Sequence, residues 1–532
     1  GAFDLQAQAA LTLSGSKLFV NQATTQASGG AFRVSGGSVL SLDDTSSLDV
    51  QGCSAGTLGG GMHLTGSGTS FMAAPGMFLS SVSFSNCSAI TAGAGMAVAE
   101  AASADLQGSL LRATGCVLLH PSGQGAGLYL GNSAVAVFSE IVITHNQAAG
   151  LSSSGAGIHL SDSVMTVRGR AQLANNRGSA QGISCGAGMS AVSSSAVFAS
   201  VNATGNSCQH GFGGAFALIQ SSLSISGSAN SSSWLQDNAA IEGASFFLDS
   251  SSYLTLSSPV VVHTAATAGG FLKCARESSS SFTSELSVRV SGLPAMEVSA
   301  IEAINCALHL SGSIHMLNLQ PAAVRAVRLE HSQATVSGRL MIENFGSPDL
   351  HEGGGLHLSD KSVLWATVNS SVLLLTNSAR QGGGAHVSSG SALVSGPAIA
   401  AARSLTSEEA LICDHNALIG NTPSGISFSV LQNRGLRGAG VYASGGSTVC
   451  LSAARIEHNV ATESAGAIEL DSVDPSSFLH HVSIRDNSAG CSRAGLVCRG
   501  GASGRCAAQT LWVYSSLIDA NTAPQTVRKE VS

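Results

Sequence analysis

A short phrase returns about every 30 residues along this chain of 532 residues. It consists of two or three small residues, mostly glycine, followed by an apolar, a variable and a second apolar residue. Copies include GGAF at 29–32, GGGMHL at 59–64, GAGLYL at 125–130, GGGLHL at 353–358 and GAGVYA at 438–443. Self-similarity at a fixed period in this range is typical of stacked repeat proteins. We therefore expect one continuous repeat domain over residues 1–532, which acts through the surface that it displays.

One repeat, which begins at Gly353, predicts the form of a single coil. In its GGGLHL phrase we expect Leu356 and Leu358 to face inward and His357 to face outward, because strand side chains alternate between faces. The two leucines should then be fully buried and the histidine exposed. The apolar runs VLWATV and VLLLTN that follow predict two further strands, separated by corners rich in Ser, Asp and Asn.

Three short strands per coil, stacked in parallel, predict an all-β fold, a single right-handed parallel β-helix. The hand follows because connections between parallel strands of one sheet are almost always right-handed. The period persists where glycine is lost, as in AMEVSA at 295–300, AVRAVRL at 323–329 and ALIC at 410–413. Counting these copies gives about 17 coils. Extra residues around 397–437 predict a loop insertion at one corner.

Composition agrees with an elongated β-protein. Only 10% of the residues are charged and the mean hydropathy is +0.27, whereas disordered chains combine low hydropathy with high charge. The 24 Lys and Arg residues are scattered, so we expect no nucleic-acid partner. No apolar run reaches the ~18 residues of a membrane helix, so we expect no membrane insertion by this segment. The chain begins with Gly1 and neither end reads as a cap, which predicts a fragment of a longer protein that can self-associate end to end.

A second column consists of an aliphatic residue followed three positions later by Asn, directly after the third strand of a coil. Its members include Asn146, Asn176, Asn238, Asn377, Asn459, Asn487 and Asn521. Asn suits a corner because it tolerates left-handed backbone angles, and stacked Asn amides can hydrogen-bond to one another.

The glycine-led phrase and the Asn column together carry a family resemblance. With GGAF at 29–32 and 213–216, the chain resembles the repeats of the chlamydial polymorphic outer membrane proteins over nearly its full length. The resemblance implies a pectin-lyase-like β-helix in a surface adhesin. Most copies here read GAG or GGG instead, and Ile, Leu or Val replaces the family's Phe before the Asn.

Polysaccharide-degrading enzymes also use this fold, and they need clustered carboxylates beside an Arg or Lys. The best cluster combines Arg455, Glu457 and His458 of one coil with Arg485 and Asp486 of the next. We interpret these residues as solvated positions beside a corner, so neither catalysis nor a cofactor is expected.

Histidine and cysteine residues raise two further possibilities. His357 and His386 occupy the outward position on consecutive coils and should stack about 5 Å apart, near enough to share a transition-metal ion. No carboxylate or Cys occupies a matching position, which favours the absence of a metal. Cys53 and Cys87 should be stacked neighbours, and both a disulfide and a pair of buried free thiols are compatible with that placement.

Taken together, these patterns predict a non-catalytic scaffold for surface display or adhesion, located outside the cell or on its surface. Its partner would be a cell-surface protein or a glycan. A polysaccharide lyase or hydrolase and a purely structural spacer are the alternatives.

Overall fold

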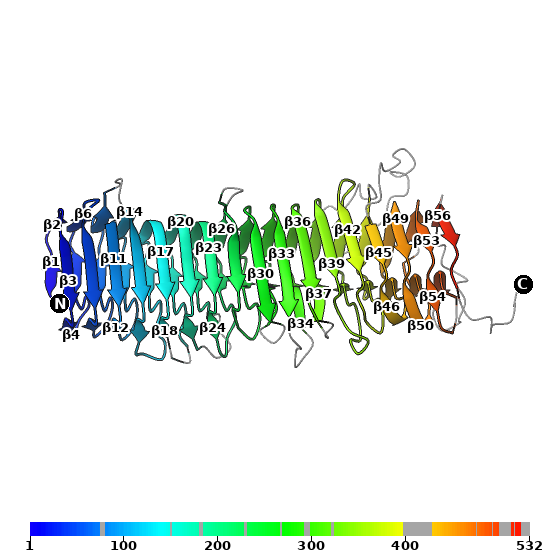
Figure 1. Cartoon of the computed structure of the whole chain (residues 1–532), viewed down its shortest axis with the longest axis horizontal. Helices are drawn as coiled ribbons and strands as arrows, with labels where there is room; N and C mark the ends of the chain where they lie inside the picture. The colour runs from blue at the N-terminus through cyan, green and yellow to red at the C-terminus, as the bar shows by residue number, and fades with distance from the viewer. Residues whose placement is uncertain are drawn as a thin grey trace, which may run out of the picture. The chain divides into compact units, whose positions relative to one another are not determined.

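Every regular element of the described chain is a β-strand. The computed structural model describes residues 1–532 except 75–79, 149, 151, 180–184, 228–230, 266–268, 292–297, 321–323, 397–427, 475, 492, 500–511, 515 and 523–532. The chain divides into two compact units, Gly1–Ser279 and Ser280–Ser532. Strands of successive coils pair in parallel within each unit, which confirms the predicted parallel β-helix (Figure 1).

In the first unit, the strand that opens each repeat pairs with its counterpart in the next repeat, and these lead strands form one parallel sheet. The register aligns the first apolar residues, so that Met96 pairs with Leu128 and Leu128 with Ile158. The lead strands are β1 (Phe3–Leu5), β5 (Phe32–Ser35), β9 (Met62–Thr65), β13 (Met96–Ala99), β16 (Leu128–Gly131), β19 (Ile158–Ser161), β22 (Met189–Val192), β25 (Phe216–Ile219), β28 (Phe246–Asp249) and β31 (Leu272–Ala275).

The second and third predicted strands of a coil belong to one sheet. In four coils they merge into a single long strand with an irregular register near its middle: β14 (Ser103–Thr114), β17 (Val135–Thr144), β20 (Val164–Ala174) and β23 (Ser195–Thr204). The corner expected between them is therefore only a bulge there. Elsewhere in this unit the two strands are separate: β2 (Ala10–Leu13), β3 (Lys17–Asn21), β6 (Val39–Leu42), β7 (Ser47–Gln51), β10 (Ser70–Ala73), β11 (Ser80–Ser85), β26 (Ser222–Ile225), β27 (Ser233–Gln236), β29 (Tyr253–Leu256) and β30 (Val260–Ala265).

A third sheet of two-residue strands follows the corner column in the first unit. These strands are too short to show alternation in the sequence, which is why the pattern did not predict them. They are β4 (Thr24–Thr25), β8 (Ser54–Ala55), β12 (Ser88–Ala89), β15 (Val117–Leu118), β18 (Gln147–Ala148), β21 (Arg177–Gly178) and β24 (Ser207–Cys208).

The second unit repeats this plan. Its lead strands are β34 (Val298–Ile304), β37 (Val324–Glu330), β40 (Leu356–Ser359), β43 (Ala385–Val387), β47 (Val441–Ser444), β51 (Ile468–Asp471) and β55 (Leu496–Arg499). The other long strands are β33 (Leu286–Ser291), β35 (Ala307–Leu310), β36 (Ser313–Asn318), β38 (Gln333–Val336), β39 (Arg339–Glu343), β41 (Val363–Ala366), β42 (Ser371–Leu375), β44 (Ala392–Ser395), β45 (Phe428–Leu431), β48 (Thr448–Ser452), β49 (Ala454–Glu457), β52 (Phe478–His480), β53 (Ser483–Arg485), β56 (Trp512–Tyr514) and β57 (Leu517–Asp519). A small third sheet contains β46 (Arg434–Arg437), β50 (Val460–Ser464) and β54 (Ser488–Ala489). Over the described residues the two units hold 17 lead strands, in agreement with the expected number of coils.

Of the predicted insertion around 397–437, residues 397–427, and with them the ALIC phrase, lie outside the described residues. The remainder is regular structure, because β45 pairs in register with β49 from Phe428 onward and β46 pairs with β50.

Aligned apolar columns fill the interior of both units. Leu356 and Leu358 are fully buried, as predicted, and the rings of Phe216 and Phe246 stack 5.2 Å apart in the first unit. Each buried Leu or Phe contributes about 1.5–3 kcal/mol of hydrophobic stabilisation. The prediction that His357 is exposed is wrong, since only 6% of its surface is accessible.

Two ladders of polar side chains join the corners of successive coils by hydrogen bonds. In the Asn column, the Asn146 amide donates to Asn176 Oδ1 at 3.0 Å, and Asn176 donates to Asn206 Oδ1 at 2.9 Å. In the second unit the same chain of bonds joins Asn377, Asn433 and Asn459. These bonds confirm the predicted stacking of the Asn amides.

A serine ladder at the other end of the lead strands was not predicted. The backbone N–H of Ser163 donates to Ser194 Oγ at 3.0 Å, and that of Ser194 donates to Ser221 Oγ at the same distance. In the second unit Ser332 and Ser362 repeat the arrangement. The abundance of Ser in the sequence conceals these ladder positions.

Candidate functional site

The polar cluster predicted near the Asn corner is only partly assembled. Arg455 and Glu457 form an ion pair on β49, with Nη2 and Oε2 2.6 Å apart. The strand register places Glu457 beside Arg485 of β53. His458 and Asp486 occupy left-handed corner positions, with φ of 58° and 51°, and their side chains are exposed.

The environment of Glu457 suits an ion pair better than proton transfer. Its hydrogen bond and charge interaction with Arg455, together with a hydrogen bond from Ser483 Oγ, hold the pKa of this carboxyl below its usual range. A carboxyl held ionised is a poor general acid at neutral pH. Arg455, His458, Arg485 and Asp486 are exposed, as predicted, but Glu457 is only 6% exposed, so the interpretation as a solvated position is wrong for Glu457.

The outward residues of the lead strands form a partly buried row, which we call the outer row. It contains Arg33, His63, Ala97, Tyr129, His159, Ser190, Ala217, Phe247 and Lys273 in the first unit, and Arg328, His357, His386, Tyr442 and Glu469 in the second. Most of these side chains are buried, including Glu469 at 0% exposure. The sequence interpretation of this position as exposed is therefore wrong.

The glycine turn explains the burial. Gly353 has φ of 57°, and a Cβ atom placed on it would lie 2.8 Å from His357 Cβ, so the turn packs directly against the outward side chain. The turn also brings the residue five positions earlier over the row. Ser154 Oγ thus lies 3.0 Å from His159 Nδ1, and Ser464 Oγ donates to Glu469 Oε2 at 2.5 Å.

The rings of His357 and His386 stack as predicted, with centroids 5.2 Å apart and planes 10° apart. Burial lowers the pKa of His357 to about 2, with the help of nearby positive charges, and burial lowers that of His386 to about 4, so both rings are neutral at neutral pH. Parallel rings at this separation do not offer nitrogen atoms to one ion at roughly 2.0–2.1 Å. The geometry favours ring stacking over shared metal coordination.

Glu469 of the outer row takes part in a partly buried ion-pair network in the second unit. Arg437 donates through Nε to Glu469 Oε1 at 2.9 Å, and its Nη2 lies 3.4 Å from Asp471 Oδ2. The Arg437 guanidinium also lies 5.0 Å from the centre of the Tyr442 ring. These residues come from three separate coils, and the sequence contains no signal that they meet.

A further set of metal-ligating groups lies where lead strands β37 and β40 end, and sequence reasoning missed it. The set consists of three ligand atoms that lie within 4.8 Å of one another, one each from Glu330, His331 and Asp360. Glu330 already pairs with Arg328 at 2.8 Å, so this arginine competes with any cation for the carboxylate.

Cys53 and Cys87 are buried free thiols on consecutive coils, and Cys116 follows them on the next coil. Of the two alternatives left open by the sequence, the structure therefore shows the buried free thiols. Burial raises the pKa of the Cys53 thiol, and a hydrogen bond with Cys116 together with burial raises that of Cys87. The thiols continue the Asn column, because the backbone N–H of Cys116 donates to Asn146 Oδ1 at 2.9 Å.

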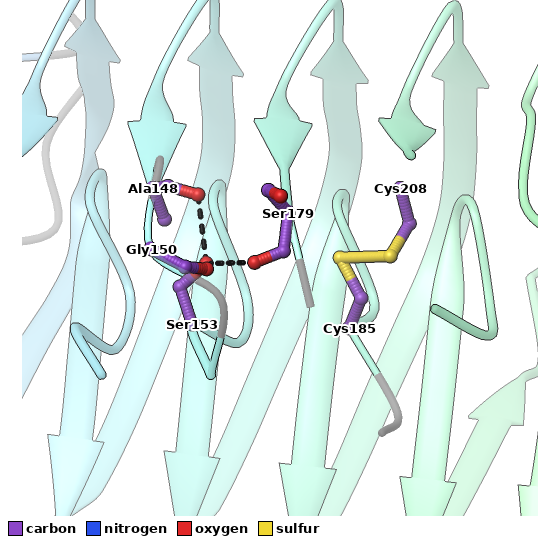
Figure 2. Close-up of a disulfide and its surroundings, with 6 residues drawn as sticks. All are labelled: Ala148, Gly150, Ser153, Ser179, Cys185 and Cys208. Carbon is purple, nitrogen blue, oxygen red and sulfur yellow. Dashed lines mark hydrogen bonds between the residues drawn. A yellow bond between two sulfur atoms is a disulfide. The ribbon is translucent and has the colours of Figure 1, made fainter. Parts of the chain in front are cut away.

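A disulfide joins Cys185 and Cys208, whose Cα atoms are 6.0 Å apart (Figure 2). In the adjoining coils the Ser153 hydroxyl lies 2.7 Å from the Ala148 carbonyl oxygen and 2.9 Å from that of Ser179. Cys274, Cys306 and Cys450 are also disulfide-bonded. Cysteine spacing alone did not indicate any of these bonds.

No protein-family model, curated protein or solved structure matches the chain. The described part of the chain contains no helix with the length and apolar character needed to cross a membrane.

Proposed function

We propose that the chain is a non-catalytic β-helix scaffold, located outside the cell or on its surface, that displays binding surfaces for adhesion. The observation that carries the proposal is the ladder construction within each unit. Repeating Asn and Ser hydrogen bonds and stacked apolar columns join neighbouring coils, as a rigid display scaffold requires.

Two further observations support this function. Disulfides persist in oxidising compartments, and at least Cys185, Cys208, Cys274, Cys306 and Cys450 are disulfide-bonded. Glu457, the most promising catalytic carboxylate, forms an ion pair with Arg455. The resemblance to chlamydial surface adhesin repeats points the same way.

Location is tested in the native organism. Intact cells are treated with a membrane-impermeant biotin reagent, and the cysteines of the recovered protein are mapped under non-reducing conditions. We expect biotin labelling, or recovery from the medium, with Cys185 and Cys208 oxidised. An unlabelled intracellular protein with reduced cysteines would exclude the proposed location.

Adhesion and catalysis need separate assays. Beads coated with the chain should bind to cells of the kind that the organism contacts in nature, and uncoated beads should not. The chain incubated with pectin, alginate or glycosaminoglycans, with and without Ca²⁺, should release no unsaturated products or reducing ends. Product formation that is lost in Arg455→Ala, Glu457→Ala or Asp486→Ala would instead establish the polysaccharide-degrading alternative and locate its site.

A further inference from the structure

An open hollow lies on the first unit, outlined by four side chains in one register row. Val164, Ser195, Ser222 and Tyr253 pair in succession across β20, β23, β26 and β29. Val164 is 46% exposed and Tyr253 is 56% exposed, whereas the two residues between them are short serines. The resulting hollow has a volume of about 440 Å³, within the range of roughly 300–1,000 Å³ that is typical of small-molecule sites.

The floor of the hollow is rigid. It contains the buried ladder serines Ser163, Ser194 and Ser221, each of which donates its hydroxyl proton to a backbone carbonyl at 2.7 Å. The Oγ atoms of Ser194 and Ser221 also accept hydrogen bonds from the backbone N–H groups of Ser163 and Ser194, which links neighbouring coils. Because every one of these hydroxyls has partners, the floor does not need to rearrange when a ligand enters.

The walls and rim offer hydrogen bonds and an aromatic surface but little charge. Ser195 Oγ accepts from Ser222 Oγ at 2.9 Å, and both side chains remain partly exposed. Gln220 and Asp162 stand exposed on the rim, and Asp162 is the one charged residue of the lining. Serine hydroxyls both donate and accept, and a tyrosine provides an apolar ring with a polar tip.

This chemistry selects among ligand classes. A polyanion would meet the carboxylate of Asp162 with no cation in the lining to balance it. A purely apolar ligand would bury the hydroxyls of Ser195 and Ser222 without new partners. A neutral molecule with many hydroxyl groups and apolar ring faces avoids both costs.

We propose that this hollow binds a short neutral oligosaccharide. One sugar ring packs against Tyr253, and the following rings hydrogen-bond to Ser195, Ser222 and the Gln220 amide. The row spans three strand spacings, about 14 Å, which suits a linear chain laid across the strands. This inference rests on the proposed function in that it names the class of ligand through which the scaffold adheres.

The test is calorimetry and saturation-transfer NMR of the full chain with cellotriose, maltotriose and the N-acetylglucosamine trimer, with trigalacturonate as the charged counterpart. We expect saturable binding of at least one neutral trisaccharide and weaker or no binding of trigalacturonate. Tyr253→Ala should weaken that binding roughly three- to tenfold. Ser195→Trp, which fills the hollow from a partly exposed position, should abolish it.

Trp234→Ala is the matched control, because Trp234 is 44% exposed in the same unit but does not line the hollow. The affinity of Trp234→Ala for the trisaccharide should equal that of the original chain. Thermal melting should verify that all variants fold. The proposal is overturned if no neutral trisaccharide binds, if trigalacturonate binds best, or if binding survives both Tyr253→Ala and Ser195→Trp. Bead adhesion without trisaccharide binding would reject the hollow alone, whereas trisaccharide binding by a protein found inside the cell would reject the proposed location alone.

Discussion

At the scale of single residues, burial in this chain depends on where a side chain lies relative to the glycine turn. Leu358 and His357 are neighbours on β40 and point to opposite faces, yet both are buried. Leu358 lies in the interior, as strand alternation requires. His357 is covered from outside by its own turn, so its burial depends on Gly353 and on the position of Glu352.

Stability should fall on acidification because of the buried histidines. Burial lowers the pKa of His63, His159 and His386 to about 4 in the folded chain, below the usual value of 6.5. The unfolded chain therefore binds more protons between these values. The stability that depends on these neutral rings is fully present above the unfolded pKa of 6.5 and declines as the pH falls toward 4, by roughly 1 kcal/mol per pH unit for each histidine.

Denaturant midpoints at pH 7.5, 6.0 and 5.0 measure this decline. His386→Gln should flatten it, whereas His309→Gln should not, because His309 is exposed. Equal slopes in His386→Gln and in the original chain would show that His386 does not resist protonation.

Leu358→Ala tests the predicted strand register. Leu358 is fully buried, so its truncation should lower the free energy of unfolding by about 2–5 kcal/mol. Val368→Ala in the same coil should change it by less than about 0.5 kcal/mol, because Val368 is exposed. Denaturant unfolding compares the two variants, and equal effects would contradict the register.

At the scale of elements, ladders stabilise corners in both units, and each Asn side chain within a ladder bonds to the coils on both sides of it. Asn176 donates to the Ile143 carbonyl and to Asn206, and it accepts from the backbone and amide of Asn146. Removing one member therefore affects the coils on both sides of it. Stability resides in the column rather than in any single coil.

Asn176→Ala should lower the free energy of unfolding by about 2–4 kcal/mol, because it leaves buried groups on both sides without partners. Asn175→Gly is the control. Asn175 is exposed with φ of 55°, a conformation that glycine also adopts readily. Thermal melting of both variants checks the prediction, and a neutral Asn176→Ala would mean that the amide ladder is not a source of stability.

The buried thiols Cys53, Cys87 and Cys116 allow the opposite experiment, in which an Asn is added to the ladder. Cys116 occupies the position next to Asn146 in the same column, with its Sγ 3.8 Å from the Phe84 carbonyl oxygen. Asn146 makes the equivalent contact to the Ala113 carbonyl at 3.0 Å. Cys116→Asn should therefore extend the ladder and raise the free energy of unfolding by about 1 kcal/mol. A lower melting temperature would show that this coil does not accept the amide.

At the scale of the whole molecule, both units follow the same construction, and the disulfides add local constraints to it. The bond between Cys185 and Cys208 closes a segment with a sequence separation of 23. A loop of this size is expected to contribute about 3 kcal/mol by restricting the unfolded chain.

Reduction should therefore loosen the first unit locally. Hydrogen exchange with and without a phosphine reductant should show faster exchange in residues 185–219 and little change in β9 or β13. The paired substitutions Cys185→Ser and Cys208→Ser should reproduce the effect, whereas Cys491→Ser, at an exposed free thiol, should not. Unchanged protection after reduction would contradict a stabilising role for this disulfide.

Repetition along the chain is enough to predict the period, the parallel coils, the inward leucines and the Asn column, because these features depend on local alternation and corner chemistry. The contacts between coils became known only from the folded structure. The buried outer row, the Arg437 and Glu469 pair, the disulfide from Cys185 and the hollow beside Tyr253 join residues that are distant in sequence or covered by a turn. Such contacts depend on how one coil is placed on the next, and no pattern within a single repeat encodes that placement.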